Sequence, residues 1–103
     1  MKVHELKCWP QFFDMMAHGE KNFEIRKNDR DFADGDTINE REWNPETQKY
    51  TGRTMSVKII AVIPVEMLKT VLDWWNEEFV VMSLQPMSPV FMQELDDEGN
   101  QVE

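Results

Sequence analysis

The chain has 103 residues, of which 41% are hydrophobic, and carries a formal net charge of −9. This length supports one modest core and not two domains, while the apolar content argues against a disordered chain. The excess of acidic residues argues against sequence-independent binding to duplex nucleic acid, because such binding needs many contacts between basic side chains and phosphates. A local site for a nucleotide or a single-stranded loop is compatible with this charge.

The sequence shows no signal for export or for a membrane span. Cys8 is the single cysteine, so an intrachain disulfide is excluded and a reducing compartment is favoured. The N-terminal segment lacks the apolar stretch of a signal peptide. The longest apolar stretch, residues 59–63, is far shorter than the ~20 residues that a membrane span needs. We therefore expect a cytoplasmic protein that does not associate with membranes.

The first thirty residues predict a strand, a helix and a second strand. Period-two alternation predicts the first strand over residues 3–8. The helix, residues 10–18, is expected to begin at Pro10 and to end at Gly19, since proline suits the first helical position and glycine the C-terminal cap. Helical spacing predicts a buried stripe formed by Phe12, Phe13, Met16 and Ala17.

The second strand, residues 22–28, also alternates with period two. Its two apolar side chains, Phe23 and Ile25, are expected to point into the core. The opposite face of this strand then carries Asn22, Glu24 and Arg26.

The remaining elements complete a small α+β domain. Further strands are predicted over residues 37–43, 54–63 and 79–84, and a second helix over residues 65–76. The longest strand has an apolar face formed by Met55, Val57, Ile59, Ala61 and Ile63. Because regular βα alternation is absent, a doubly wound parallel sheet is disfavoured. Five strands and two helices predict a small, curved β-barrel with both helices packed against it.

The domain is expected to span residues 1–87 and to be followed by an acidic tail, residues 88–103. Pro86 and Pro89 interrupt regular structure at this boundary. The acidic side chains of the tail are Glu94, Asp96, Asp97, Glu98 and Glu103. We expect the tail to be flexible, with a short ordered stretch near residues 90–92.

A cluster of basic residues around one carboxylate is the candidate site. Residues 1–30 contain six basic and five acidic side chains, whereas the rest of the chain contains five and fifteen. This cationic segment in an anionic chain predicts a pocket for a small anionic or polar ligand. The expected ligand-binding residues are Lys21, Glu24, Arg26, Lys27 and Arg30. The alternative is that charges of both signs only solvate a hairpin.

The chemistry of this cluster suits a polar ligand. Glu24 and Arg26 are two apart on a strand, about 6.6 Å, so both can contact one molecule. The guanidinium presents a planar fork to a carbonyl or phosphate, and the carboxylate accepts from an amide or amino group. Lys21 is the candidate catalytic residue, since a partly desolvated lysine is suited to catalysis.

A metal site and a cofactor are not expected. His4 and Cys8 are four apart on a predicted strand, which separates their Cα atoms by about 13 Å and is too far for one zinc ion. The four glycines are too dispersed to form a phosphate-binding loop. Trp43 is predicted to pack on the core and not to serve as a platform for a base.

The run Gly19-x-Lys21-x-x-Glu24-x-Arg26 resembles the signature of ASCH domains in the PUA-like superfamily. Further blocks are similar to a subgroup of small bacterial and phage proteins whose function is uncharacterised. These blocks are residues 4–7, 23–32, 35–36, 41–43 and 50–53. The resemblance covers residues 3–87 and implies a compact β-barrel with helices at its rim.

The resemblance also implies a class of ligand, because ASCH and PUA-like domains are associated with RNA or modified nucleotides bound in a cleft lined by the signature. One ASCH branch hydrolyses the amide of an acetylated cytidine with a lysine and a threonine of this motif and a glutamate elsewhere. Lys21 matches that lysine, but Glu24 stands at the threonine position, so this chemistry does not carry over. Glu77 and Glu78 are candidates for the distant glutamate.

Three functions follow as expectations. The first is a binding module for RNA or a nucleotide-like ligand. The second is a protein-interaction or inhibitor role of a phage type, through an acidic surface and with a protein partner. The third is a small amidohydrolase that acts on a modified nucleoside. The sequence leaves the ligand's identity, the catalytic activity and the oligomeric state open.

Overall fold

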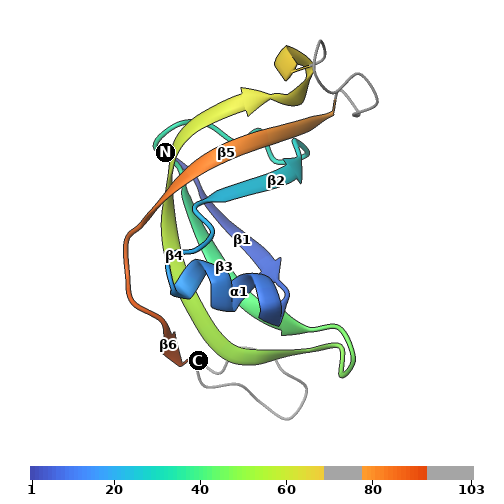
Figure 1. Cartoon of the computed structure of the whole chain (residues 1–103), viewed down its shortest axis with the longest axis vertical. Coiled ribbons are helices and arrows are strands. Elements are labelled where there is room, and N and C mark those ends of the chain that lie inside the picture. The colour runs from blue at the N-terminus through green and yellow to red at the C-terminus, as the bar shows by residue number, and fades with distance from the viewer. Residues whose placement is uncertain (69–77, 93–103) are drawn as a thin grey trace.

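The structure, a computed structural model, describes residues 1–68 and 78–92 and contains one mixed sheet and one short helix (Figure 1). The strands are β1 (Val3–Cys8), β2 (Phe23–Lys27), β3 (Thr37–Asn44), β4 (Lys49–Pro64), β5 (Phe79–Pro86) and β6 (Phe91–Met92). Helix α1 (Pro10–Ala17) follows β1, and a 3-10 turn, η1 (Val65–Leu68), follows β4. The α+β class and the five predicted strands are confirmed, and β4 is longer than expected because it begins at Lys49, directly after the hairpin turn.

The sheet curls into a half-barrel. Its strand order is β1-β3-β4-β5-β2, and β6 pairs with β4 beside this path. β1 and β3 run parallel, and the other neighbouring strands are antiparallel. The long strand β4 bends through the whole molecule, and α1 lies against the curved sheet (Figure 1). β1 and β2, distant in strand order, are therefore the two edges of one curved wall.

Helix α1 begins and ends where the sequence predicts. Pro10 is the first helical residue, and Gly19 lies just beyond the end with a φ of +74°. Phe13 and Met16 are buried, as expected. The predicted stripe is wrong at Phe12 and Ala17, which are exposed. The helix has eight residues and turns only a narrow line of side chains toward the sheet, so Phe12 is left at its margin.

Strand β2 reverses the expected orientation. Phe23 and Ile25 are 47% and 41% exposed, whereas Glu24 is 5% exposed. The alternation predicted correctly which side chains share a face, but the prediction that the apolar face points inward is wrong. β2 is an edge strand, and its charged face is turned inward because the Glu24 carboxylate finds cationic partners there.

Strand β4 follows the predicted alternation only as far as Ile59, which is fully buried. The pairing of β4 with β5 then shifts register between Ile59 and Ala61, as in a β-bulge. Beyond this point Ile63 is 43% exposed, and Val62 packs against the core instead. A single extra residue therefore transfers the next side chains to the other face of the sheet.

The predicted second helix and tail are only partly covered by the described residues. The structure shows η1 with Val65 buried, while residues 69–77 lie outside the described ranges. The ordered stretch expected near residues 90–92 is confirmed, since Phe91 and Met92 pair with Thr54 and Arg53 of β4. The rest of the expected tail, residues 93–103, lies outside the described ranges, so the predicted flexibility stays a prediction.

We expect removal of residues 94–103 to leave the melting temperature nearly unchanged. This segment contains only Leu95 and Val102 as sizeable apolar side chains, so it offers little surface for burial. Deletion preserves β6 and its pairing with β4. The measurement is thermal unfolding of the two chains side by side. A large fall in melting temperature in the shortened chain contradicts the expectation.

An ion network joins α1 to the sheet. Arg53 on β4 donates from Nε and Nη2 to Glu42 on β3, at 2.9 and 2.6 Å, and from Nη2 to Asp14 on α1, at 2.6 Å. Glu42 is buried and also accepts from the Thr51 hydroxyl. The hydrogen bonds from Arg53 hold the pKa of Glu42 below its usual value. This network ties α1 to β3 and β4.

Candidate functional site

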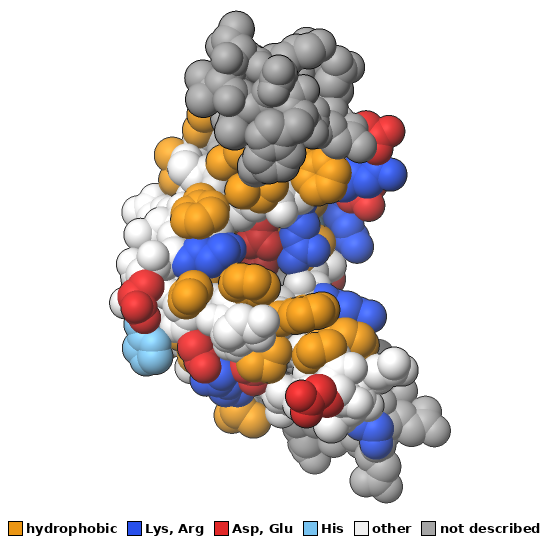
Figure 2. Space-filling view, turned by 45° about the vertical axis from the view of Figure 1, so that its right-hand side comes forward, with side chains coloured by type: hydrophobic (Ala, Val, Ile, Leu, Met, Phe, Trp, Pro, Cys, Tyr) orange, Lys and Arg blue, Asp and Glu red, His pale blue; other side chains and the backbone are white. Residues whose placement is uncertain are grey.

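A cleft of about 740 Å³ lies between α1, the turn that follows it, and strands β1 and β2. Its apolar lining consists of Trp9, Phe12, Met15, Phe23, Ile25 and Phe79. The remaining lining residues are Lys7, Cys8, Glu20, Lys21, Glu24, Arg26 and Lys27. Figure 2 shows this arrangement as a central band of basic and acidic side chains with hydrophobic side chains gathered on both sides of it. The cleft therefore combines an apolar wall with a charged floor.

Three of the predicted ligand-binding residues meet at this floor. Arg26 Nε donates to Glu24 Oε1 at 2.8 Å, and Lys21 Nζ lies 3.8 Å from Glu24 Oε2. Lys21 also donates to the backbone oxygen of Phe23 at 2.8 Å. The three side chains are 6% (Glu24), 16% (Lys21) and 31% (Arg26) exposed. They form a fixed, partly desolvated cluster, so the alternative of charges that only solvate a hairpin does not describe them.

The other two predicted residues lie at the edge of the cleft or beyond it. Lys27 lines the cleft and forms an ion pair with Glu78 at 3.2 Å. Arg30 does not line the cleft; its Nη1 donates to the backbone oxygen of Glu5 on β1 at 3.2 Å. Arg26 makes a similar contact, because its Nη2 donates to the backbone oxygen of Lys7 at 2.6 Å. Two guanidinium groups thus link the two edges of the half-barrel.

Beneath Glu24 lies a second carboxyl group that the sequence analysis missed. Glu40 on β3 is fully buried, and neither of its carboxyl oxygens has a hydrogen-bond donor among the described residues. Burial, followed by the negative charge of Glu24, raises the pKa of Glu40 to about 8, although Arg26 and Lys21 oppose the shift. At neutral pH the protonated form of Glu40 is therefore favoured.

The sequence did contain a signal for Glu40. Period-two alternation along β3 places Ile38, Glu40 and Glu42 on one face, and all three are buried. The apolar Ile38 identified this face as the inner one. Glu40 and Glu42, which follow it on the same face, were therefore candidates for buried carboxyl groups. Only the curl of the sheet brings Glu40 to Glu24, because β2 and β3 are not neighbours in the sheet.

Cys8 and His4 are both buried, and their surroundings suit a structural role. Burial, and then the nearby Glu40 and Glu24 charges, raise the pKa of the Cys8 thiol to about 12, so it is not a thiolate nucleophile at neutral pH.

His4 is buried with its Nε2 2.9 Å from Asp36 Oδ2. Asp36 also accepts from the backbone N–H groups of Lys2 and Ala33. These hydrogen bonds, that of Lys2 foremost, lower the pKa of Asp36 to about 2. This cluster ties the N-terminus to the turn before β3.

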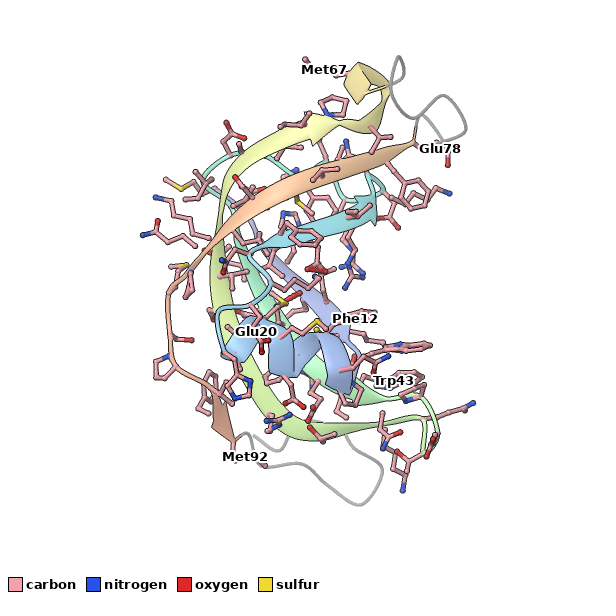
Figure 3. All side chains as sticks on the ribbon, viewed as in Figure 1. Phe12, Glu20, Trp43, Met67, Glu78 and Met92 are labelled. Carbon is pink, nitrogen blue, oxygen red and sulfur yellow. The ribbon has the colours of Figure 1, made fainter. Side chains whose placement is uncertain are left out.

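The residues proposed for a hydrolytic reaction are only partly assembled. Lys21 adjoins the buried Glu24 and Glu40. Glu78 does not line the cleft; it lies at the start of β5, as labelled in Figure 3, and lines a smaller recess with Lys27. Glu77 lies outside the described residues. Within residues 1–68 and 78–92, no group of three His, Cys, Asp or Glu side chains is placed to hold a metal ion.

The fold and cleft define a small α+β protein built on a curled half-barrel with a charged, ligand-sized cleft at its open edge. Residues 3–84 match the family described as a domain of unknown function, DUF3850, and the chain belongs to this family. That match includes β1 to β4 and most of β5, and therefore the whole charged floor of the cleft.

Two relatives illustrate the range of similarity. An uncharacterised 12.9 kDa protein in the GpA 3′ region of Escherichia phage P2 is 35% identical over 81 residues, which is 79% of this chain and 66% of the phage protein. The match thus spans slightly less than two thirds of that relative's length. The crystal structure of the hypothetical protein PH0355 superposes with a TM-score of 0.51 at 17% identity, covering 84% of this chain and all of the other, which supports the fold alone. No helix in the described part of the chain is long and apolar enough to cross a membrane.

Proposed function

We propose that this chain is an ASCH-type, PUA-like binding module that takes a nucleotide-like ligand, free or as an unstacked base of RNA, in the cleft. One observation carries the proposal. Trp9, Phe12 and Phe23 are each between 44% and 47% exposed, and they line the same cleft as the partly buried Lys21–Glu24–Arg26 cluster. Exposed aromatic rings beside fixed polar groups are the two elements needed to recognise a base, by stacking and by hydrogen bonds to its edge.

The polar floor is preorganised for a base edge. Glu24 Oε2 is buried and has no hydrogen-bond donor among the described residues, so it offers an acceptor to an amino or imino group. Arg26 and Lys21 supply donors for a neighbouring carbonyl. The Lys21 ammonium lies 5.8 Å from the Phe12 ring centre and 5.1 Å from that of Phe23, which links the floor to the aromatic wall. A planar heterocycle satisfies both sets of contacts together.

The charge of the chain limits this function to a local contact. With 20 acidic and 11 basic residues, the chain does not present the continuous basic surface that a long nucleic-acid backbone needs. We therefore propose recognition of one or two nucleotides, with the ligand's base in the cleft. A cytoplasmic location, which the single cysteine favours, is part of the proposal.

We expect Arg26→Ala to weaken ligand binding by about 1.5–3 kcal/mol, because it removes a charged donor from the floor of the cleft. Arg26→Lys should restore little, since an ammonium does not reproduce the planar fork. Glu24→Gln tests whether the acceptor needs its charge. The measurement is titration with nucleosides, nucleotides and short single-stranded RNA.

The matched control is Lys58→Gln, which removes one charge from an exposed position on β4 outside the cleft. Thermal melting of each variant separates lost binding from lost folding. This step is required because Arg26 also bonds to β1 and Glu24 is buried, so their substitution can change the stability of the fold. Binding that survives the Arg26 and Glu24 substitutions in folded protein contradicts the proposed site.

A second candidate function rests on the paired carboxyls. Glu40, whose pKa is raised to about 8, lies near the Glu24 carboxylate and Lys21, and a carboxyl group with a pKa close to neutral pH is a usual basis for acid–base catalysis. This arrangement favours a hydrolase for a modified nucleoside as the alternative. The deciding measurement is turnover of acylated nucleosides, which the binding-module function does not produce.

A further inference from the structure

A second group of side chains with binding chemistry lies next to the cleft, on β1, β3 and β4. Lys7 and Arg41 are direct neighbours in the parallel pairing of β1 and β3. Trp43 and Tyr50 are neighbours in the antiparallel pairing of β3 and β4. Figure 3 labels Trp43 at the end of β3, where the wall of the half-barrel runs into the hairpin. We name these four residues the Lys7–Arg41 group.

Within this group, the cations contact aromatic rings instead of carboxylates. Lys7 Nζ lies 4.4 Å from the Trp43 ring centre and 6.0 Å from that of Tyr50. The Arg41 guanidinium carbon lies 3.8 Å from the Tyr50 ring centre. Trp43, which the sequence predicted as a core residue, is half-buried in this contact. The nearest carboxylate along the same face of β1 is Glu5, which accepts from Asn39 instead.

The charges of this pair are not compensated within the described part of the chain. Other basic residues form ion pairs there, among them Lys2, Lys21, Arg26, Lys27 and Arg53. Lys7 and Arg41 form none, although they stand side by side on strands about 4.8 Å apart. Like charges directly opposite one another on a sheet are destabilising. Arg41 Nε and Nη2 are moreover buried without a hydrogen-bond acceptor.

We propose that the Lys7–Arg41 group is an oxyanion subsite that binds the phosphate of the ligand whose base occupies the cleft. The inference rests on the proposed function and extends it, because it makes the ligand a phosphorylated nucleotide and not a nucleoside. A phosphate oxygen would supply the acceptor that the two Arg41 nitrogens lack and would separate two like charges.

The position of Lys7 connects this subsite with the cleft. Lys7 lines the cleft, and its backbone oxygen accepts from Arg26, which belongs to the floor. Alternation places Lys7 and Arg41 on the face of the sheet opposite Cys8 and Glu40, and β1 is an edge strand, so the sugar of a base on that floor would pass over the edge of β1 to bring its phosphate to Arg41. Lys7 is exposed, so its flexible side chain can leave the Trp43 ring, admit the phosphate to Arg41 and become a second ligand.

The test measures the affinity of each of the four ribonucleosides and of its 3′- and 5′-monophosphates. The proteins are wild type and the variants Lys7→Gln, Arg41→Gln and Lys58→Gln. We expect one monophosphate series to bind about 10- to 100-fold more tightly than the nucleosides, the range of a hydrogen bond to a charged group. Lys7→Gln and Arg41→Gln should abolish this ratio, whereas Lys58→Gln, with the same loss of charge, should keep it. Lys7 is exposed, so its variant remains informative even if Arg41→Gln unfolds.

Sodium pyrophosphate alone gives an independent readout. In an NMR titration we expect it to shift the Arg41 Nε–Hε and Trp43 indole resonances of wild type but not of Lys7→Gln. Equal affinities for nucleosides and monophosphates, with no such shift, overturn the subsite. A preference for the monophosphates that persists in both Lys7→Gln and Arg41→Gln also overturns it. Pyrophosphate binding without binding of any nucleoside or nucleotide contradicts the proposed function and reduces the Lys7–Arg41 group to an oxyanion site that is independent of the cleft. Nucleoside binding without discrimination for phosphate contradicts only the subsite.

Discussion

The E40Q variant is expected to be more stable than wild type at pH 8, by on the order of 3 kcal/mol. In wild type, Glu40 is fully buried and its pKa is raised to about 8 by burial and by the charge of Glu24. Keeping this group in the interior near pH 8 requires either an unfavourable proton uptake or an unfavourable buried charge. A glutamine of the same shape carries no charge and can donate its N–H to Glu24.

The sign of the pH dependence follows from proton binding. Between the ordinary glutamate pKa of 4.5 and about 8, folded Glu40 holds a proton that the unfolded chain has released. The free energy of unfolding contributed by Glu40 therefore falls as pH rises through this window. Below pH 4.5 Glu40 is protonated in both the folded and the unfolded state, so its contribution to the free energy of unfolding no longer changes with pH. E40Q removes this pH dependence. The free energies of unfolding of the two proteins should therefore differ little at pH 4, and the difference should grow up to about pH 8.

The measurement is urea unfolding of wild type and E40Q at intervals from pH 4 to 9. Glu46→Gln, at an exposed hairpin position, is the matched control for loss of one carboxylate. Parallel pH profiles for wild type and E40Q would show that Glu40 is ionised at neutral pH, or that water reaches it, and would contradict the raised pKa of Glu40.

Arg53→Ala is expected to lower the free energy of unfolding by about 3 kcal/mol. The substitution leaves the Glu42 carboxylate buried without its bidentate partner, and an uncompensated buried charge is strongly destabilising. It also releases the contact between α1 and β4 through Asp14 and the stacking of the guanidinium on Phe13, 4.8 Å from the ring centre. Chemical denaturation measures the loss.

Two companion variants separate these contributions. Asp14→Asn removes only the outer pair, whose carboxylate is 52% exposed, and should cost under about 1 kcal/mol. The double substitution Glu42→Gln and Arg53→Ala should be less damaging than Arg53→Ala alone, because it also removes the orphaned charge. A loss for Arg53→Ala no greater than that for Asp14→Asn would show that Glu42 is hydrated and that the network adds little.

Most of the secondary structure could be predicted because it depends on neighbours along the chain. Pro10 and Gly19 bracket α1, and alternation over residues 3–8 and 37–43 gives β1 and β3 nearly to the residue. The acidic composition and the segment with Lys21, Glu24 and Arg26 were also visible in the order of residues alone. These features need no knowledge of which elements pack together.

The face of a strand and the composition of the site were decided by the tertiary structure. Alternation groups Glu24 with Arg26, but only the position of β2 at an edge of the curled sheet turns that pair inward and leaves Phe23 exposed. The bulge after Ile59 reverses the faces of β4, which a fixed period cannot foresee.

By itself, the sequence determined a single small α+β domain, its strands, its first helix and the charged segment that forms the floor of the cleft. The tertiary structure decided that Glu40 lies beneath Glu24, that Arg30 bonds to β1 outside the cleft, and that Lys7 stands beside Arg41 and Trp43. The physical reason is that these contacts join strands distant in sequence. Their free energies depend on burial and on the charges of neighbours, which exist only once the sheet has curled.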